Sequence, residues 1–208
     1  MQLAHVSTKV LITGRSGSGK TTYFQRYLQG LPAGVKRWIF DAEGELSIRL
    51  GVRAVSSPDE ISVAAQAGDW LVYDPAPMFP GRIPDAFRFF CSWAWHAAAR
   101  MPGRKVFAVD ELQRFTTTAT IAPEAALVLE TGRRYGLDLV AAAQQPNLIH
   151  NRFRNQMTEL AVFATTDPRA QEAIAAWGVD PRGAARLQDG EFVAVNLRSR
   201  RQVRGRVF

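Results

Sequence analysis

The sequence predicts an α/β fold with a mostly parallel central sheet, helices on both faces and short antiparallel strands near the C-terminal end. Short apolar runs alternate with helical segments along the 208 residues, which is typical of parallel sheets covered by helices. No repeat, linker or shift in composition interrupts this pattern. We therefore expect a single domain over residues 1–208, in which residues 190–208 form a basic extension.

The first predicted elements are a buried strand at residues 9–13 and an amphipathic helix at residues 22–28. Further strands are expected at 37–41, 54–56, 70–74, 105–109, 137–143, 160–165, 192–196 and 202–207. Further helices are expected at 58–66, 84–100, 123–135 and 168–177.

The helix at 84–100 is apolar nearly all round, because it carries Phe87, Phe89, Phe90, Trp93 and Trp95. Such a helix is buried on more than one side, in the core or against a neighbouring subunit. A base-stacking surface is the alternative, but basic residues do not alternate with these aromatic side chains. Core packing is therefore the favoured interpretation.

A glycine-rich motif joins the first strand to the first helix. It follows the pattern G-x-x-x-x-G-K-[ST] and consists of Gly14, Arg15, Ser16, Gly17, Ser18, Gly19, Lys20 and Thr21. Glycines allow backbone N–H groups to turn towards a polyphosphate, and a helix N-terminus adds its positive dipole end. We expect this loop and the adjoining Thr22 to bind ATP, with Lys20 on the terminal phosphates and Thr21 on Mg²⁺.

The strand at 105–109 ends in two acids, Asp110 and Glu111. This is the pattern of a Walker B strand, in which Asp110 holds Mg²⁺ through its water shell. Glu111 is then the general base that polarises the attacking water. A positioned base favours a hydrolase over a small-molecule kinase, which would also need an acceptor pocket and an arginine-rich lid.

The strand at 137–143 ends in Gln144, Gln145 and Pro146. Ligands of open α/β sheets bind at the carboxyl ends of the strands. If this strand lies between the first strand and the acid-bearing strand, Gln144 arrives beside the γ-phosphate. We interpret Gln144 as a sensor of phosphate or lytic water, with a turn-capping glutamine as the alternative.

The composition limits the compartment and the partners. The formal net charge of +7 makes an anionic macromolecular partner plausible, although a coding bias towards arginine explains it equally well. Cys91 is the single cysteine, which excludes an intrachain disulfide and favours a reducing compartment. No run of 18 apolar residues occurs, so we expect a soluble protein without stable membrane insertion of its own.

Several segments together resemble the FtsK-HerA superfamily of DNA-translocating ATPases. Residues 132–139 and 142–146 resemble the family's arginine-bearing helix end and its sensor strand. Residues 41–45 resemble its Asp-Pro-Lys-Gly-Glu segment, and residues 155–193 resemble its closing pattern. The sequence departs from the family at Ala143, Gln145 and Ala42–Glu43. The resemblance implies a RecA-like (ASCE) P-loop NTPase with ATP and Mg²⁺ as its cofactors.

Family members work as rings, usually hexamers, in which an arginine of one subunit completes the site of its neighbour. Arg133 is the nearest match to that arginine, with Arg134, Arg152 and Arg154 as reserves. A trans arginine neutralises charge that develops on the γ-phosphate.

In length the chain is most similar to the genome-packaging ATPases of tailless viruses with an internal membrane. This implies a motor that translocates double-stranded DNA into a preformed capsid, partnered by a capsid vertex or portal protein, at the packaging vertex or in the host cytoplasm. Secretion, conjugation or filamentous-phage assembly ATPases are the alternative, followed by a kinase or a nucleotide-gated adaptor. The expected DNA contacts are arginines that track phosphates, with a solubilising edge strand as the alternative. They are Arg152, Arg154, Arg198, Arg200, Arg201, Arg204 and Arg206.

Overall fold

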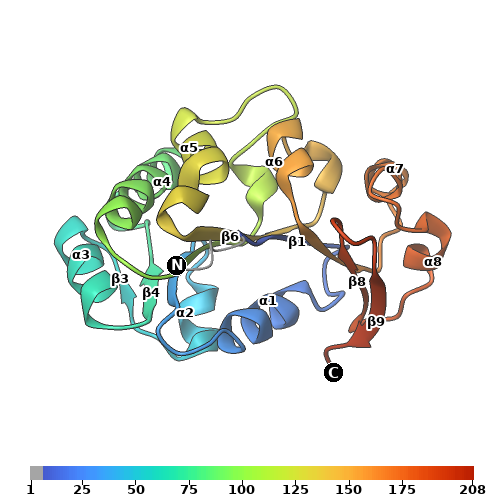
Figure 1. Cartoon of the computed structure of the whole chain (residues 1–208), viewed down its shortest axis with the longest axis horizontal. Helices are drawn as coiled ribbons and strands as arrows, with labels where there is room; N and C mark the ends of the chain where they lie inside the picture. The colour runs from blue at the N-terminus through green and yellow to red at the C-terminus, as the bar shows by residue number, and fades with distance from the viewer. Residues whose placement is uncertain (1–6) are drawn as a thin grey trace, which may run out of the picture. The chain divides into compact units, whose positions relative to one another are not determined.

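A computed structural model describes residues 7–208 (Figure 1). The described chain divides into two compact units. The first contains residues 28–110 and 122–139, and the second contains residues 8–27, 111–121 and 140–208. Strand β6 (Leu137–Ala143) begins in the first unit and ends in the second. Whether the chain forms the single domain expected over residues 1–208 stays a prediction.

The sheet of the first unit is parallel. Its strands run in the order β3 (Ala54–Val55), β4 (Trp70–Tyr73), β2 (Lys36–Phe40) and β5 (Lys105–Val109), with the start of β6 next to β5. Trp38 of β2 lies opposite Leu71 of β4 and Phe107 of β5. Because side chains alternate along a strand, Trp38 and Phe40 face one side of β2 and Arg37 faces the other.

An aromatic cluster fills the side of β2 that carries Trp38 and Phe40. Helix α4 (Ile83–Arg100) supplies Phe90 and Trp93, whose rings stack with centroids 5.4 Å apart, and Trp93 packs edge-on against Trp38 at 5.0 Å. Helix α5 (Pro123–Thr131) packs against α4, as Figure 1 shows. The prediction that this aromatic helix is buried on more than one side is confirmed.

Two helices pack near the edge strands of the first unit. Helix α3 (Pro58–Ala67) contacts β3 and β4, and it begins at a capping box formed by Ser57 and Glu60. Helix α2 (Glu45–Leu50) follows β2 and lies between two glycines in left-handed conformation, Gly44 and Gly51. The serine and glutamate of a capping box satisfy backbone N–H groups at the helix start, so they fix where α3 begins.

Buried cations tie the loops of the first unit to its strands. Arg37, 3% exposed, donates from Nε to the carbonyl of Leu28 at 2.8 Å and from Nη1 to the carbonyl of Val35 at 2.6 Å. Lys105, 1% exposed, donates from Nζ to the carbonyls of Ala98 at 3.2 Å and Tyr135 at 2.9 Å. Burial lowers the pKa of both cations. Their hydrogen bonds go to backbone carbonyls, which makes them structural groups.

The sheet of the second unit ends in antiparallel strands, as predicted. The end of β6 is followed by β1 (Lys9–Thr13) and β7 (Glu159–Phe163), and β1 pairs with β7 in parallel. Strand β8 (Glu191–Asn196) is antiparallel to β7, and β9 (Gln202–Arg206) is antiparallel to β8. The amino-terminal ends of β1 and β7 therefore lie at the same edge as the turn between β8 and β9.

Helix α1 (Lys20–Gln29) packs on this sheet through Tyr23, whose ring contacts Phe163 at 5.7 Å and Phe192 at 4.8 Å. Burial raises the pKa of Tyr23. Helices α7 (Pro168–Ala175) and α8 (Pro181–Ala185) lie side by side (Figure 1), and Asp167 and Asp180 cap their N-termini.

The structure adds elements that were not predicted. Helix α2, helix α6 (Asn151–Gln156) and helix α8 were missed, and the helix expected at 123–135 ends at Thr131. The chain continues from there as a turn of 3₁₀ helix, Gly132–Tyr135. Two further 3₁₀ turns occur, at Leu112–Arg114 and Pro146–Leu148.

Candidate nucleotide site

The phosphate-binding loop runs from the end of β1 to the start of α1, as the sequence predicts. Gly14 has φ 149° and Gly19 has φ 109°, which are conformations that side chains rarely allow. A Cβ on Gly14 would lie 2.6 Å from Cβ of Phe163, so the loop can pass β7 only with glycine there. Helix α1 begins at Lys20, and the N–H groups of a first helical turn lack partners within the helix. The loop thus presents backbone donors and a helix dipole to an anion.

Two side chains of the loop hold its shape. The Lys20 Nζ donates to the carbonyl of Arg15 at 2.9 Å, and Ser18 Oγ donates to the same carbonyl at 2.8 Å. Lys20 is 6% exposed and Ser18 is fully buried. Because both bonds converge on one carbonyl, the lysine is already placed along the loop to which a phosphate would bind.

The turn before β8 and the residues after β9 pack on this loop, which the sequence did not predict. The N–H of Gly190 donates to the carbonyl of Ser18 at 2.9 Å, and Asp189 forms an ion pair with Arg15 at 2.5 Å. A Cβ on Gly19 would lie 3.0 Å from Cγ2 of Val207, which is buried. The C-terminal hairpin therefore forms one wall of the loop.

Glu111 directly precedes the 3₁₀ turn Leu112–Arg114 and has a strained conformation. Its φ is 53°, one of two positive values among the non-glycine residues 7–208. Such conformations cost about 1–3 kcal/mol and occur often at active sites. The left-handed conformation of Glu111 turns the backbone away from the extended path of β5 and so changes the direction of the Glu111 side chain.

The carboxylate of Glu111 is held by two amides. Gln144 Nε2 donates to Oε1 of Glu111 at 2.8 Å, and Gln113 Nε2 donates to Oε2. Each carboxylate oxygen can accept more than one hydrogen bond, so both remain able to accept from water. The predicted sensor and the predicted base thus lie in direct contact, although the sequence placed Gln144 on phosphate or water.

Asp110 follows the last residue of β5 and precedes Glu111 in the chain. A hydroxyl and a carboxylate are hard oxygen donors of the kind that Mg²⁺ prefers, so Thr21 and Asp110 fit that ion chemically. No cluster of three or more His, Cys, Asp or Glu residues suited to a metal occurs within residues 7–208. Any Mg²⁺ here would take its other ligands from phosphate and water.

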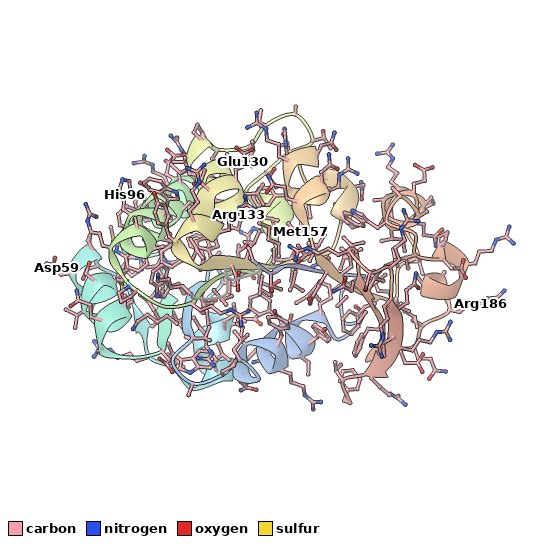
Figure 2. The ribbon with its side chains drawn as sticks, in the orientation of Figure 1. Asp59, His96, Glu130, Arg133, Met157 and Arg186 are labelled. Carbon is pink, nitrogen blue, oxygen red and sulfur yellow. The ribbon has the colours of Figure 1, made fainter. Side chains whose placement is uncertain are left out.

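The predicted arginines lie in several places. Arg133 and Arg134 are exposed on the 3₁₀ turn of the first unit, where Figure 2 labels Arg133. In the second unit, Arg152 and Arg154 lie on α6, and Arg204 and Arg206 lie on β9. Arg198, Arg200 and Arg201 lie in and after the turn between β8 and β9. Arg154, Arg198 and Arg200 line one common groove, which brings the two predicted DNA-contacting segments together.

No family model matches this sequence, and no curated protein matches it either. Among the solved structures that are similar over nearly the whole chain are three different proteins. The genome-packaging NTPase B204 of Sulfolobus turreted icosahedral virus 2, in complex with AMPPCP, has TM-score 0.70 and 18% identity, covering 96% of this chain and 97% of its own. VirB4 of Thermoanaerobacter pseudethanolicus has TM-score 0.72 and 13% identity, covering 100% and 91%. The bacterial conjugative coupling protein TrwB has TM-score 0.67 and 13% identity, covering 99% and 89%.

These neighbours are P-loop ATPases of the FtsK-HerA superfamily. The chain therefore has a RecA-like P-loop NTPase fold with a mostly parallel sheet, and the expected fold class is confirmed. No helix within residues 7–208 has both the length and the apolar character needed to cross a bilayer.

Proposed function

We propose that this chain is an ATP-hydrolysing motor that moves double-stranded DNA, of the kind that packages a viral genome into a preformed capsid. The observation that carries the proposal is the contact between Glu111 and Gln144 in the unit that contains the phosphate-binding loop. The fold likeness to B204, a genome-packaging NTPase, supports the choice of motor.

The proposed chemistry is attack of water on the γ-phosphate of ATP. Glu111 accepts a proton from that water, and its strained backbone together with Gln144 and Gln113 holds the carboxylate in place. On ATP binding, the Nζ of Lys20 exchanges its bond to the Arg15 carbonyl for phosphate oxygens and neutralises charge there. The loop N–H groups orient the triphosphate.

Thr21 and Asp110 are the residues we assign to Mg²⁺, which when bound would neutralise phosphate charge. Their hydroxyl and carboxylate oxygens are donors of the kind that this ion prefers.

We further propose that the chain acts as a homo-oligomeric ring, with a hexamer as the expected size and a capsid vertex or portal protein as its partner. Arg133 then completes the site of the neighbouring subunit. Its exposure on the 3₁₀ turn leaves its guanidinium accessible to a second copy. An arginine supplied in this way stabilises the charge of the transferred phosphoryl group.

Glu111→Gln tests the function. The variant keeps the size of the side chain and one acceptor oxygen for the amides of Gln144 and Gln113, but it removes the base. We therefore expect ATP turnover to fall about 100- to 10,000-fold. Binding of ATP should stay close to that of the unchanged protein. Phosphate release is measured with and without a DNA duplex, together with the size of the oligomer.

Glu172→Gln is the matched control, since it makes the same charge change on exposed α7 of the same unit. It should turn over ATP at the normal rate. Retained hydrolysis in Glu111→Gln would overturn the assignment of the base, and phosphate release that no DNA stimulates would overturn the DNA motor.

A secretion or conjugation ATPase is the second candidate, because VirB4 and TrwB match this chain as well as B204 does. Stimulation by single-stranded DNA or by unfolded protein, without stimulation by duplex DNA, would favour it.

A further inference from the structure

A groove of about 880 Å³ lies at the edge of the second unit that is opposite to the phosphate-binding loop. The residues before β7 form one side of it, where Met157 (labelled in Figure 2) and Thr158 lie. The turn after β8 forms another side and begins at Leu197, whose N–H donates to the carbonyl of Thr158 at 2.9 Å. Strand β1 starts at this edge and leads to the phosphate-binding loop at the other.

The charge of this groove is of one sign. Arg154, Arg198 and Arg200 line it, together with amide and hydroxyl side chains, and none of its lining residues is acidic. Arg154 and Arg200 have no carboxylate within ion-pair distance among residues 7–208. Elsewhere arginines are often paired, as Arg88 is with Glu124 and Arg104 with Asp138. Arg154 and Arg200 therefore bring positive charge to the groove that no carboxylate of the described residues neutralises.

Arg154 has an incomplete set of hydrogen bonds. One of its terminal nitrogens donates to Oδ1 of Asn151, whereas its Nε is buried and has no acceptor. Buried guanidinium N–H groups nearly always have a partner, so this one requires an explanation. Arg154 also lines the groove, and a guanidinium binds phosphate oxygens through its N–H groups, so this side chain is a suitable partner for an anion there.

The turn between β8 and β9 holds the other two arginines at the rim. Oδ1 of Asn196 accepts from the N–H of Arg198 at 3.1 Å and from the N–H of Ser199 at 2.9 Å, which fixes the start of the turn. Arg200 is exposed and has φ 56°, a conformation that favours glycine or asparagine over arginine. This conformation is common where a short turn enters the second strand of a hairpin, and it leaves the Arg200 side chain exposed at the groove.

We propose that this groove binds the phosphodiester backbone of duplex DNA without reading its sequence. The anion recognition rests on Arg154, Arg198 and Arg200, and the choice of DNA rests on the proposed function. Groove size and the spread of arginines over α6 and the turn suit an extended polyanion better than one small ion. A lipid surface fits poorly, because none of the exposed large apolar residues among 7–208, such as Val203 and Phe208, lines the groove.

Binding of a fluorescein-labelled 30-base-pair duplex, measured by anisotropy without nucleotide over a series of salt concentrations, tests this proposal. We expect Arg200→Glu to weaken binding about tenfold, and the slope of log Kd against log salt to fall by about 1–2. Trp177 also lines the groove, so duplex binding should quench tryptophan fluorescence, and Trp177→Phe should reduce that quenching.

Arg186→Glu is the matched control, an exposed arginine at the end of α8 that lies well apart from Met157 in Figure 2. It should change the affinity less than about twofold, and thermal unfolding checks that both variants are folded. Equal losses in the two variants, or no loss in Arg200→Glu, would overturn the groove. The proposal would also be overturned if Arg200→Glu lost binding to phosphatidylserine vesicles but kept its binding to DNA. The binding measurements contain no nucleotide, so their outcomes do not depend on ATP hydrolysis. A failure of the groove proposal can therefore be distinguished from a failure of the Glu111→Gln experiment.

Discussion

The two units use their basic residues in opposite ways. In the first unit, Arg37 and Lys105 are buried at the starts of β2 and β5, and their N–H groups donate to backbone carbonyls near the ends of helices and in the connections after them. In the second unit, Lys20 is bonded within a glycine-rich loop, and Arg154, Arg198 and Arg200 line an open groove. Basic residues alone therefore do not indicate a ligand, because the cations of the first unit are buried and bonded to the backbone whereas the arginines of the second unit line an open groove.

The two units also differ in how their side chains pack. The first unit has an aromatic cluster in which Phe90 contacts Tyr73 at 5.1 Å and Phe107 at 5.4 Å. In the second unit, glycines of the phosphate-binding loop pack closely against neighbouring segments, as Gly14 does against Phe163 and Gly19 against Gly190. We therefore expect substitutions in the first unit to act on stability and substitutions at the nucleotide site to act on turnover.

The largest effect is expected from Phe90→Ala in the first unit. Phe90 is fully buried, so its removal should lower the free energy of unfolding by about 3–5 kcal/mol. The measurement is denaturant unfolding followed by reaction of Cys91 with a thiol reagent. Cys91 is the only cysteine, it is buried on the same helix, and burial raises the pKa of its thiol well above the usual value. Its labelling therefore reports opening of α4.

Val63→Ala is the control for this substitution, since Val63 is 66% exposed on α3. It should change the free energy of unfolding by less than about 0.5 kcal/mol. A similarly small effect of Phe90→Ala would contradict the view that the aromatic cluster stabilises the first unit.

A smaller and different effect is expected from Gln144→Ala in the second unit. Loss of the amide that holds Glu111 should lower kcat about 10- to 100-fold, while the free energy of unfolding changes by less than about 1 kcal/mol. Steady-state phosphate release measures the first quantity and denaturant unfolding the second. Gln145→Ala, at the exposed neighbouring position, is the control. If both variants lose turnover equally, Gln144 has no special role.

The smallest effect is expected from Ser57→Ala, which removes the N-cap of α3 and should cost about 1 kcal/mol of stability without changing turnover. Hydrogen bonds from the N–H groups of Ser56 and Ser57 and from the Ser57 hydroxyl lower the pKa of Glu60, and Ser57→Ala removes the hydroxyl bond. A lowered pKa in the folded state adds stability above the unfolded-state pKa, and this contribution is lost as the pH falls through the folded value. The difference between Ser57→Ala and the unchanged protein should therefore shrink below about pH 4.

Urea unfolding at neutral and at acid pH measures that difference. Ser62→Ala in the same helix is the control. Its free energy of unfolding should differ from that of the unchanged protein by close to zero at both pH values, because the Ser62 hydroxyl donates only to the carbonyl of Pro58 within the helix. A cost of Ser57→Ala that stays constant with pH would argue against the capping box.

The sequence was sufficient for the long elements of the fold and insufficient for the short ones. Strand β5 and helix α4 were predicted closely, because a short continuous apolar run is typical of a buried strand and an apolar segment of this length is typical of a buried helix. Helix α2 has six residues, and its Ile48 is 81% exposed, so it shows no periodic pattern to recognise. Tertiary packing and two left-handed glycines define it instead.

The candidate site was predicted where it is local and missed where it depends on chain pairing. The phosphate-binding loop is one continuous motif, so its residues were found directly. The bond between Glu111 and Gln144 joins residues 33 positions apart, and no local pattern reports such a contact. Likewise, Arg154 and Arg200 share a groove only because β8 returns antiparallel to β7. The sequence identified both arginine-bearing segments, but it did not predict that they lie in one groove.

The packing of the hairpin on the phosphate-binding loop also limits how this sequence can vary. An added Cβ would meet Val207 at position 19, Phe208 at 2.8 Å at position 190 and Phe192 at 2.5 Å at position 205. At positions 19 and 190 the positive φ also disfavours any side chain, whereas at position 205 a side chain requires a compensating change at Phe192. Among divergent relatives, we expect a glycine before β8, a small residue within β9 and a matching apolar residue after it to vary as one set. Such a set, spread over the last twenty residues, is a signature of this arrangement that the phosphate-binding motif alone does not supply.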